Sequence, residues 1–117
     1  MRIDHLQIAG PVGCEPAARE FYGGVLGLTE IEKPVALRKG GGCWFQCGEL
    51  QLHIGVEKEF RAAKKAHPAF AVENLDALRQ TLLKRGYPAI DDDNLPGSRR
   101  FYSQDPWGNR LEFMEKA

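Results

Sequence analysis

Residues 100–113 read Arg-Phe-Tyr-Ser-Gln-Asp-Pro-Trp-Gly-Asn-Arg-Leu-Glu-Phe, and this stretch decides the fold of the chain. Its centre, Asp105-Pro106-Trp107-Gly108-Asn109, is a strong turn signal because Asp, Pro, Gly and Asn each favour turn conformations. After this centre, Glu112 lies between the apolar residues Leu111 and Phe113, as in a strand that buries one face. The stretch therefore predicts two strands, at about 99–104 and 110–115, joined by a tight turn.

The same order of elements occurs twice along the chain. Residues 18–31 align with residues 77–90, so that Gly27 falls on Gly86, and residues 5–9 align with residues 67–71. A repeat of this kind indicates two copies of one supersecondary unit. The predicted boundaries are 1–57 for module one, 58–65 for a linker and 66–117 for module two, within a single domain at 1–117.

Each module is predicted to have the order βαβββ. In module one a helix is expected from Glu15 to Leu26, with Pro16 in its first turn and Gly27 at its end. In module two the helix is expected to begin at Asn74, a good capping residue. The predicted strands lie at about 2–9, 29–33, 42–47, 50–56, 67–72, 87–90, 99–104 and 110–115. The predicted fold class is α+β, with the two modules forming a curved mixed sheet around a metal-binding cleft.

The composition is that of a water-soluble globular protein. Sixteen basic residues balance sixteen acidic ones, so we expect no attraction to nucleic acid or to an anionic membrane. The longest apolar runs are far shorter than the ~20 residues that a membrane span needs. The three cysteines are an odd number and are expected to be reduced, which favours a cytoplasmic location.

Three histidines and one glutamate occupy related positions in the two modules. His5 and His67 open corresponding strands, and His53 and Glu112 lie at corresponding positions of the last strands. Because alternate residues of a strand point to opposite faces, all four should project from the face that the helix does not cover. Imidazole and carboxylate ligands suit a divalent ion such as zinc, nickel, iron(II), cobalt or manganese. The sequence thus predicts a metal site of His5, His53, His67 and Glu112.

The four predicted ligands, the repeated modules and the ending at residues 100–113 carry a family resemblance. Over its whole length, the chain resembles the vicinal oxygen chelate superfamily. That superfamily includes glyoxalase I, bleomycin-resistance proteins, fosfomycin-resistance thiol transferases and extradiol dioxygenases. The most specific element is the Phe/Tyr, Asp-Pro-x-Gly-Asn, hydrophobic-Glu ending, here Phe101 to Glu112. The resemblance implies that Glu112 is the closing metal ligand, and that His53 replaces a second glutamate of glyoxalase I.

The resemblance also implies an activity and a partner. The expected activity is that of a metal-dependent lyase or dioxygenase of the glyoxalase type, which binds two neighbouring oxygens of a small substrate on the ion. Glu112 is the expected catalytic residue. The expected substrate contacts follow from strand positions instead: Arg100 and Tyr102 lie near the same end as Glu112, and Trp44 and Gln46 share one strand face. A homodimer is implied as well.

Two other functions remain open at this point. One is a metal-free, bleomycin-resistance-type module that sequesters a drug-like ligand, for which Trp44 and Trp107 would line the groove. The other is an accessory subunit whose site is vestigial. The four ligand-type side chains favour the enzyme.

Overall fold

The computed structural model describes residues 1–116 and divides the chain into two compact units, Met1–Ala62 and Ala63–Ala117. Each unit contains one open, four-stranded mixed sheet, and the fold class is α+β, as predicted. The predicted single domain stays a prediction. Among residues 1–116, the helices are all too short or too polar to cross a membrane.

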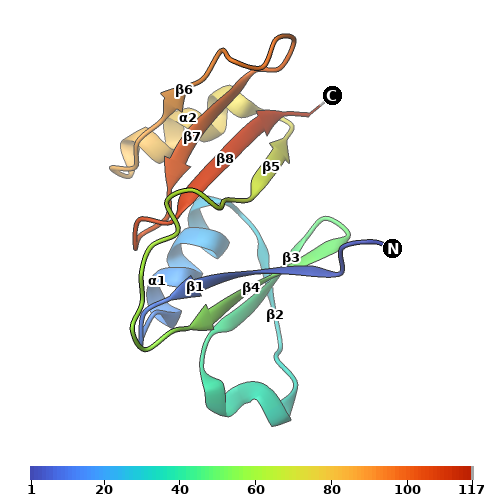
Figure 1. Ribbon diagram of the computed structural model, residues 1–117, viewed down its shortest axis with the longest axis vertical. Coiled ribbons are helices and arrows are strands. Elements are labelled where there is room, and N and C mark those ends of the chain that lie inside the picture. Colours follow the sequence, from blue (N-terminus) through green and yellow to red (C-terminus); the bar gives the residue numbers. More distant parts are fainter. Residues whose placement is uncertain (117) are drawn as a thin grey trace. The chain divides into compact units, whose positions relative to one another are not determined.

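The first unit has the strand order β1-β4-β3-β2, with β1 and β4 parallel and the other neighbours antiparallel (Figure 1). Its core contains the buried rings of Phe21, Tyr22 and Phe45. Tyr22 meets Phe21 edge-on, with their ring centroids 4.9 Å apart. The elements of this unit are β1 (His5–Gly10), α1 (Glu15–Ala18), the π-helix η1 (Arg19–Val25), β2 (Thr29–Ile31), the 3-10 helix η2 (Val35–Gly40), β3 (Cys43–Cys47) and β4 (Leu50–Val56).

The second unit repeats this topology with the strand order β5-β8-β7-β6. In Figure 1, α2 lies behind β7 and β8 and covers one face of the sheet, where Leu75 and Leu82 are buried. Phe113 is buried between Phe70 and Phe101, with ring centroids 5.5 Å and 5.4 Å from its own. The elements are β5 (Ala69–Val72), α2 (Leu75–Lys84), β6 (Ile90–Asp91), β7 (Arg100–Gln104) and β8 (Arg110–Glu115). The equal strand orders confirm the predicted repeat.

The first helix differs from the prediction of one helix over residues 15–26. Four residues are α-helical and the next seven form a π-helix, in which the amide of Leu26 donates to the carbonyl of Phe21, five residues earlier. Gly23 and Gly24 lie in this segment, and glycine is a weak α-helix former. The 3-10 helix η2 lies between the strands expected at about 29–33 and 42–47, and it was not predicted.

The helix of the second unit begins where it was predicted, directly after Asn74. The Asn74 side chain accepts a hydrogen bond of 3.0 Å from the amide of Ala77, so it caps the first turn. Gly86 follows the last turn with a φ of 87°, and Gly27 follows the first unit's helix with a φ of 77°. Both glycines adopt the left-handed conformation that side chains with a Cβ avoid, which explains why the repeat aligns them.

Several strands are shorter than predicted, and prolines account for two of them. β5 begins at Ala69 rather than at residue 67, and β6 is Ile90–Asp91 rather than 87–90. Pro68 and Pro88 stand just before these strands, and proline has no amide to donate to a ladder. The first strand spans His5–Gly10 rather than residues 2–9.

The strand registers decide which side chains share a face. Trp44 pairs with His53 and Tyr102 pairs with Glu112, and residues directly opposite each other project to the same side of a sheet. Leu52 and Ile54, on either side of His53, are buried on the other face. The predicted alternation therefore holds in β4.

The turn between β7 and β8 is held by two buried side chains, Asp105 and Asn109. Asp105 Oδ1 accepts hydrogen bonds from the amides of Trp107 at 3.0 Å and Asn109 at 2.9 Å. Asp105 Oδ2 accepts one from Asn109 Nδ2 at 2.8 Å. Asn109 Oδ1 in turn accepts from the amide of Ala63 at 2.8 Å, so the start of the unit is tied to the turn.

All three cysteines are free, as predicted. Cys14 and Cys43 are buried and Cys47 is partly exposed. Burial raises the pKa of each thiol, that of Cys43 to about 11. The thiols are therefore protonated and unreactive at neutral pH.

Replacement of Asp105 by Ala should lower the free energy of unfolding by about 3 kcal/mol, because three hydrogen-bond donors, two of them buried, lose their acceptor. Urea denaturation measures this loss. Asp93→Ala, on the exposed loop before β7, is the matched control and should change stability by less than about 0.5 kcal/mol. Equal stabilities for the two variants would contradict the role given to Asp105.

The cap of α2 can be tested in the same way. Asn74→Ala should cost about 1 kcal/mol of stability because the Ala77 amide loses its partner. Asn74→Ser, which retains a capping oxygen, should restore most of that loss in thermal or urea unfolding. A full loss in the Ser variant would argue against capping as the cause.

Candidate metal and substrate site

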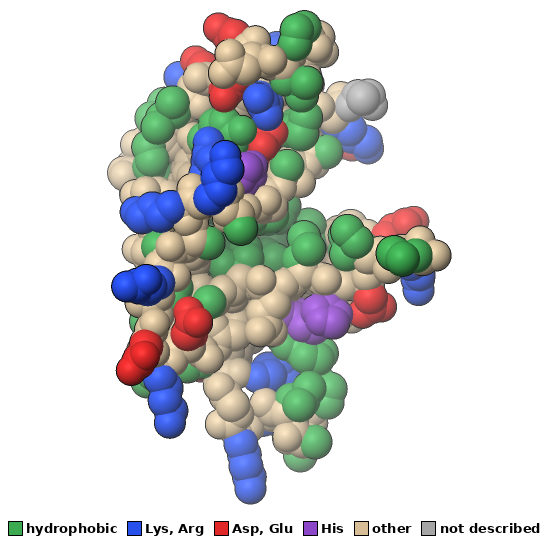
Figure 2. Space-filling model, in the orientation of Figure 1, with side chains coloured by type: hydrophobic (Ala, Val, Ile, Leu, Met, Phe, Trp, Pro, Cys, Tyr) green, Lys and Arg blue, Asp and Glu red, His purple; other side chains and the backbone are tan. Residues whose placement is uncertain are grey.

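The first unit brings together three predicted site residues, His5, His53 and Trp44. The His53 ring is stacked on Trp44, with the centroids 3.7 Å apart and the planes 1° from parallel. On its other side it is stacked on His5 at 4.3 Å and 16°. Space-filling representation shows histidine side chains at the surface of both units (Figure 2). The three rings form one continuous stack on the sheet face that the helices do not cover.

Polar neighbours orient the two imidazoles of this stack. His53 Nε2 lies 2.9 Å from Gln51 Oε1, and His5 Nδ1 lies 3.0 Å from Asp4 Oδ2. Since these oxygens are acceptors, the two nitrogens donate, which leaves Nδ1 of His53 and Nε2 of His5 as the lone-pair atoms of the neutral rings. Burial, and after it the charge of His5, lowers the pKa of His53. A neutral His53 is the form that a metal ion binds.

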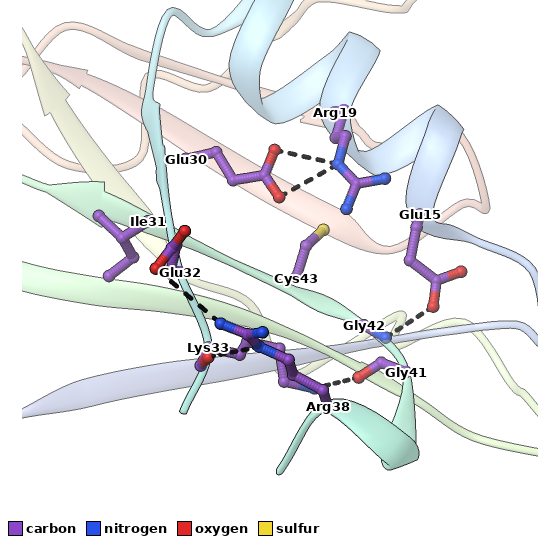
Figure 3. A pocket seen from close by; sticks show the side chains of 10 residues that line it. All are labelled: Glu15, Arg19, Glu30, Ile31, Glu32, Lys33, Arg38, Gly41, Gly42 and Cys43. Carbon is purple, nitrogen blue, oxygen red and sulfur yellow. Dashed lines mark hydrogen bonds and ion pairs between the residues drawn. The ribbon is translucent and has the colours of Figure 1, made fainter. Parts of the chain in front are cut away.

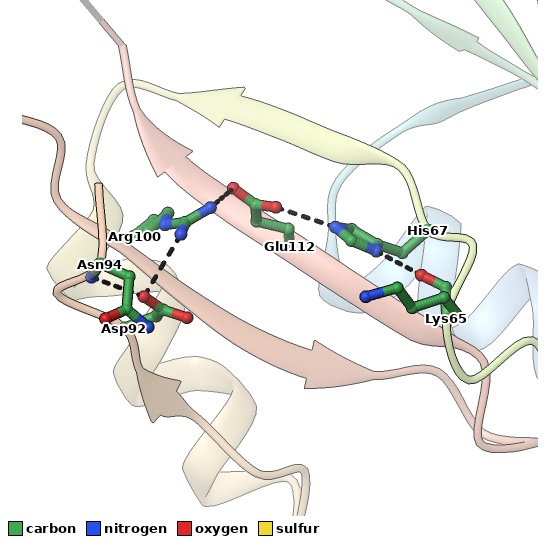
Figure 4. A network of polar contacts seen from close by, with 6 residues as sticks. All are labelled: Lys65, His67, Asp92, Asn94, Arg100 and Glu112. Carbon is green, nitrogen blue, oxygen red and sulfur yellow. Dashed lines mark hydrogen bonds and ion pairs between the residues drawn. The ribbon is translucent and has the colours of Figure 1, made fainter.

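The second unit brings together the other two predicted ligands and Arg100 (Figure 4). Glu112 is 5% exposed and has a partner at each oxygen. His67 Nε2 lies 2.9 Å from its Oε1, and Arg100 Nη1 donates to its Oε2 at 3.1 Å. Arg100 Nη2 also contacts Asp92 Oδ1, at 3.3 Å. The carboxylate is thus held between an imidazole and a guanidinium.

The His67 ring is held by an oxygen atom at each of its two nitrogens. Its Nδ1 lies 2.8 Å from the carbonyl oxygen of Lys65, which can only accept. Its Nε2 faces the carboxylate of Glu112, which in its ionised form can also only accept. Each ring nitrogen of His67 therefore faces an oxygen acceptor, and a cation between Nε2 and the carboxylate would satisfy both groups.

Opposing effects act on the pKa of Glu112. Burial by itself would raise the pKa, but the hydrogen bonds from His67 and Arg100 outweigh it and the pKa lies below its ordinary value. The carboxylate is therefore ionised at neutral pH. A buried anion of this kind is stabilised only as long as its cationic partners stay in place.

The remaining predicted substrate contacts lie beside these clusters. Tyr102 touches the edge of the His67 ring at 5.4 Å, and the guanidinium of Arg100 lies 5.6 Å from the Tyr102 ring centroid. The amide of Gln46 donates to the carbonyls of Gly48 and Leu50, at 2.8 Å and 3.1 Å. Gln46 thus stabilises the turn between β3 and β4 in the structure, while Tyr102 is in contact with a predicted ligand.

The sequence reasoning missed three residues of this region, Gln51, Asp92 and Arg110. Gln51 precedes His53 by two positions and Arg110 precedes Glu112 by two, so strand alternation alone places them on the same faces as the predicted ligands. That signal could have identified both. The ion pair of Asp92 with Arg100 carries no local sequence signal.

The four predicted ligands are of the types that bind a divalent ion, and part of their geometry also suits one. Nε2 of His67 and Oε1 of Glu112 are 2.9 Å apart, close to the ~3 Å between neighbouring ligands on an ion with bonds of about 2.1 Å. The His5 and His53 rings are nearly parallel, and lone pairs in parallel planes cannot meet at one ion. Among residues 1–116, no group of three or more His, Cys, Asp and Glu side chains is gathered to hold a metal. Each unit therefore offers one pair of donors.

Comparison with known proteins agrees with the sequence motif. The family model described as "Glyoxalase/Bleomycin resistance protein/Dioxygenase superfamily" matches residues 2–113. A search among curated proteins found no match. Among solved structures, a glyoxalase family protein from Bacillus anthracis is 55% identical, with a TM-score of 0.94 over 100% of this chain and 96% of that one.

More distant structures share the fold. A glyoxalase/dioxygenase from Nostoc punctiforme is 24% identical, with a TM-score of 0.77 over 99% of this chain and 91% of that one. A lactoylglutathione lyase from Agrobacterium tumefaciens is 22% identical, with a TM-score of 0.75 over 97% and 92%. With the family model covering nearly the whole chain, this protein belongs to the Glyoxalase/Bleomycin resistance protein/Dioxygenase superfamily.

Proposed function

We propose that this protein is a metal-dependent enzyme whose divalent ion is bound by His5 and His53 of the first unit and by His67 and Glu112 of the second. The observation that carries the proposal is the His67–Glu112 pair. A histidine nitrogen and a buried carboxylate oxygen face each other at 2.9 Å, while the other ring nitrogen is engaged by a carbonyl. A divalent cation can replace the proton between them.

When bound, the ion would act as a Lewis acid on two neighbouring oxygens of a small substrate. The proposed role of Glu112 follows from its contacts. Because both oxygens have partners and its pKa is lowered, Glu112 is suited to bind the ion, and it can accept a proton only after one contact opens. Arg100 keeps the carboxylate ionised and in place.

The residues of the first unit have two proposed roles. His5 and His53 act as ligands after one ring rotates out of the stack, since parallel rings cannot share an ion. Trp44 then offers a flat apolar wall to the substrate, because the imidazole that covers it has moved. Gln46 is proposed to contact substrate polar groups through the face that it shares with Trp44.

Metal content tests the ligand set directly. The purified protein should bind about one zinc, nickel, manganese, cobalt or anaerobic iron(II) ion per chain, as measured by elemental analysis after dialysis. Glu112→Gln and His5→Ala should each weaken binding by more than about 100-fold, beyond the 10–100-fold cost of losing an outer-shell partner. Binding should also weaken on acidification, because protons compete for the imidazole lone pairs.

A matched variant keeps this test specific. Glu115→Gln removes a carboxylate from the same strand, β8, and should retain full metal binding with an unchanged circular dichroism spectrum. An ion at about 100 times its Kd should add about 2.7 kcal/mol of stability, so real binding is visible as a thermal shift. No shift with any of the five metals would overturn the proposal. Quenching of tryptophan fluorescence by a drug-like ligand would then favour the metal-free binding module.

The homodimer implied by the family resemblance belongs to the same proposal. Sedimentation equilibrium should give twice the chain mass of 13.1 kDa at micromolar concentration. A mass of one chain across the whole concentration range would contradict it.

A further inference from the structure

A small cavity of the second unit lies beside Tyr102, outside the proposed ligand set. Its volume is about 270 Å³. The residues of its wall that matter for binding are Lys64, Tyr102, Gln104 and Arg110, which are polar, and Pro88 and Ile90, which are apolar. We call it the Arg110 pocket.

The charges of this pocket are of one sign. Its lining contains two cations, Lys64 and Arg110, and no acidic residue. Among the described residues 1–116, neither of these side chains forms an ion pair, whereas Arg100 is paired with Glu112 and Asp92. The pocket thus presents unneutralised positive charge to whatever enters it.

The larger cavity of the first unit shows the opposite arrangement (Figure 3). Its volume is about 540 Å³, but its cations have partners within its own wall. Arg19 Nε donates to both oxygens of Glu30 at 3.0 Å and 3.1 Å, and Arg38 lies 3.9 Å from Glu32. A third cavity, in the second unit, pairs Arg99 with Asp76 at 2.6 Å. In these two cavities the arginines are paired with carboxylates, unlike Arg110.

Stacking holds Arg110 in a defined position. The centre of its guanidinium lies 4.0 Å from the centroid of the Tyr102 ring. A cation in this position is attracted by the ring face, and the guanidinium is thereby ordered before any ligand binds. Because the guanidinium N–H groups lie in its plane, stacking through its face leaves them free to donate to an anion.

The same tyrosine connects the pocket to the proposed ligands. Its ring touches the edge of His67 at 5.4 Å, and in the sheet it stands directly opposite Glu112. Gln104 stands opposite Arg110 on the same face of the sheet. An anion bound in the Arg110 pocket therefore lies one side chain away from the His67–Glu112 pair.

We propose that the Arg110 pocket binds a carboxylate or phosphate group of a small substrate through Arg110, Lys64 and Gln104, with Pro88 and Ile90 contacting a short carbon segment. The substrate class is thus a small anionic metabolite whose reacting oxygens lie toward His67 and Glu112. The orientation of the reacting oxygens toward His67 and Glu112 rests on the proposed metal-dependent function, whereas the binding of the anion in the pocket does not.

An NMR titration of the ¹⁵N-labelled protein tests the binding. Sodium malonate and inorganic phosphate are added in separate experiments at constant ionic strength, with sodium chloride as the control salt. Each anion should shift the amide signals of Tyr102, Gln104, Gly108 and Arg110 saturably. The anion with the lower Kd identifies the preferred group, carboxylate or phosphate.

The variants separate the pocket from general charge effects. Arg110→Gln should weaken anion binding by about tenfold or more, the cost of one charge-assisted hydrogen bond. Arg2→Gln removes an equal charge from the exposed start of the first unit and should leave the Kd unchanged. An unchanged Kd in Arg110→Gln, or equal shifts with chloride, would overturn the proposal. If Arg110→Gln fails to fold, as judged by its spectrum, Lys64→Gln provides the same comparison.

Metal uptake distinguishes this proposal from the previous one. Arg110→Gln should bind metal as the parent protein does, because no proposed ligand is changed. Anion binding that persists in a protein without any metal affinity would support the pocket while the metal-dependent function fails. Metal binding without anion shifts would overturn the pocket alone.

Discussion

The buried hydrogen bonds between Asp105 and Asn109 are the constraint on which the second unit depends. They close the turn that joins β7 to β8, and Asn109 also binds the amide of Ala63, so the turn and the start of the unit are held together. Because a slip of one residue would turn every side chain of a strand to the other face, this turn decides that Tyr102 stands opposite Glu112. The His67 contact and the Arg110 pocket both follow from that register.

The two units repeat one topology with different chemistry on corresponding faces. Where the first unit stacks Trp44 on His53, the second places Tyr102 opposite Glu112. The first face is thus a stack of flat rings whose imidazoles have free lone pairs. The second is an ion-pair network in which a buried carboxylate is held by His67 and Arg100. One topology thus carries nitrogen donors on the sheet face of one unit and a carboxylate on the sheet face of the other.

Electrostatics links the proposed functions of the second unit. The charge of Glu112 needs nearby partners to be stable in its buried position, and in the structure these are the guanidinium of Arg100 and the imidazole of His67. Arg110 does not neutralise a carboxylate of the protein in this way, because the carboxylates near it are paired with other residues. Its guanidinium is held by stacking on Tyr102. Of these two arginines on neighbouring strands, Arg100 holds a carboxylate of the protein and Arg110 is the one proposed to bind an anion from outside.

The sequence by itself determined the order of elements, the repeat, the turn at residues 105–109 and the face from which the predicted ligands project. These features depend on local turn chemistry, glycine conformation and strand alternation, which are short-range properties. Only the tertiary structure decided that η1 is a π-helix, that His5, His53 and Trp44 stack, and that Asp92 pairs with Arg100. The stack and the ion pair join residues from different parts of the chain, and their partners depend on packing and rotamers. No pattern of neighbouring residues encodes such contacts.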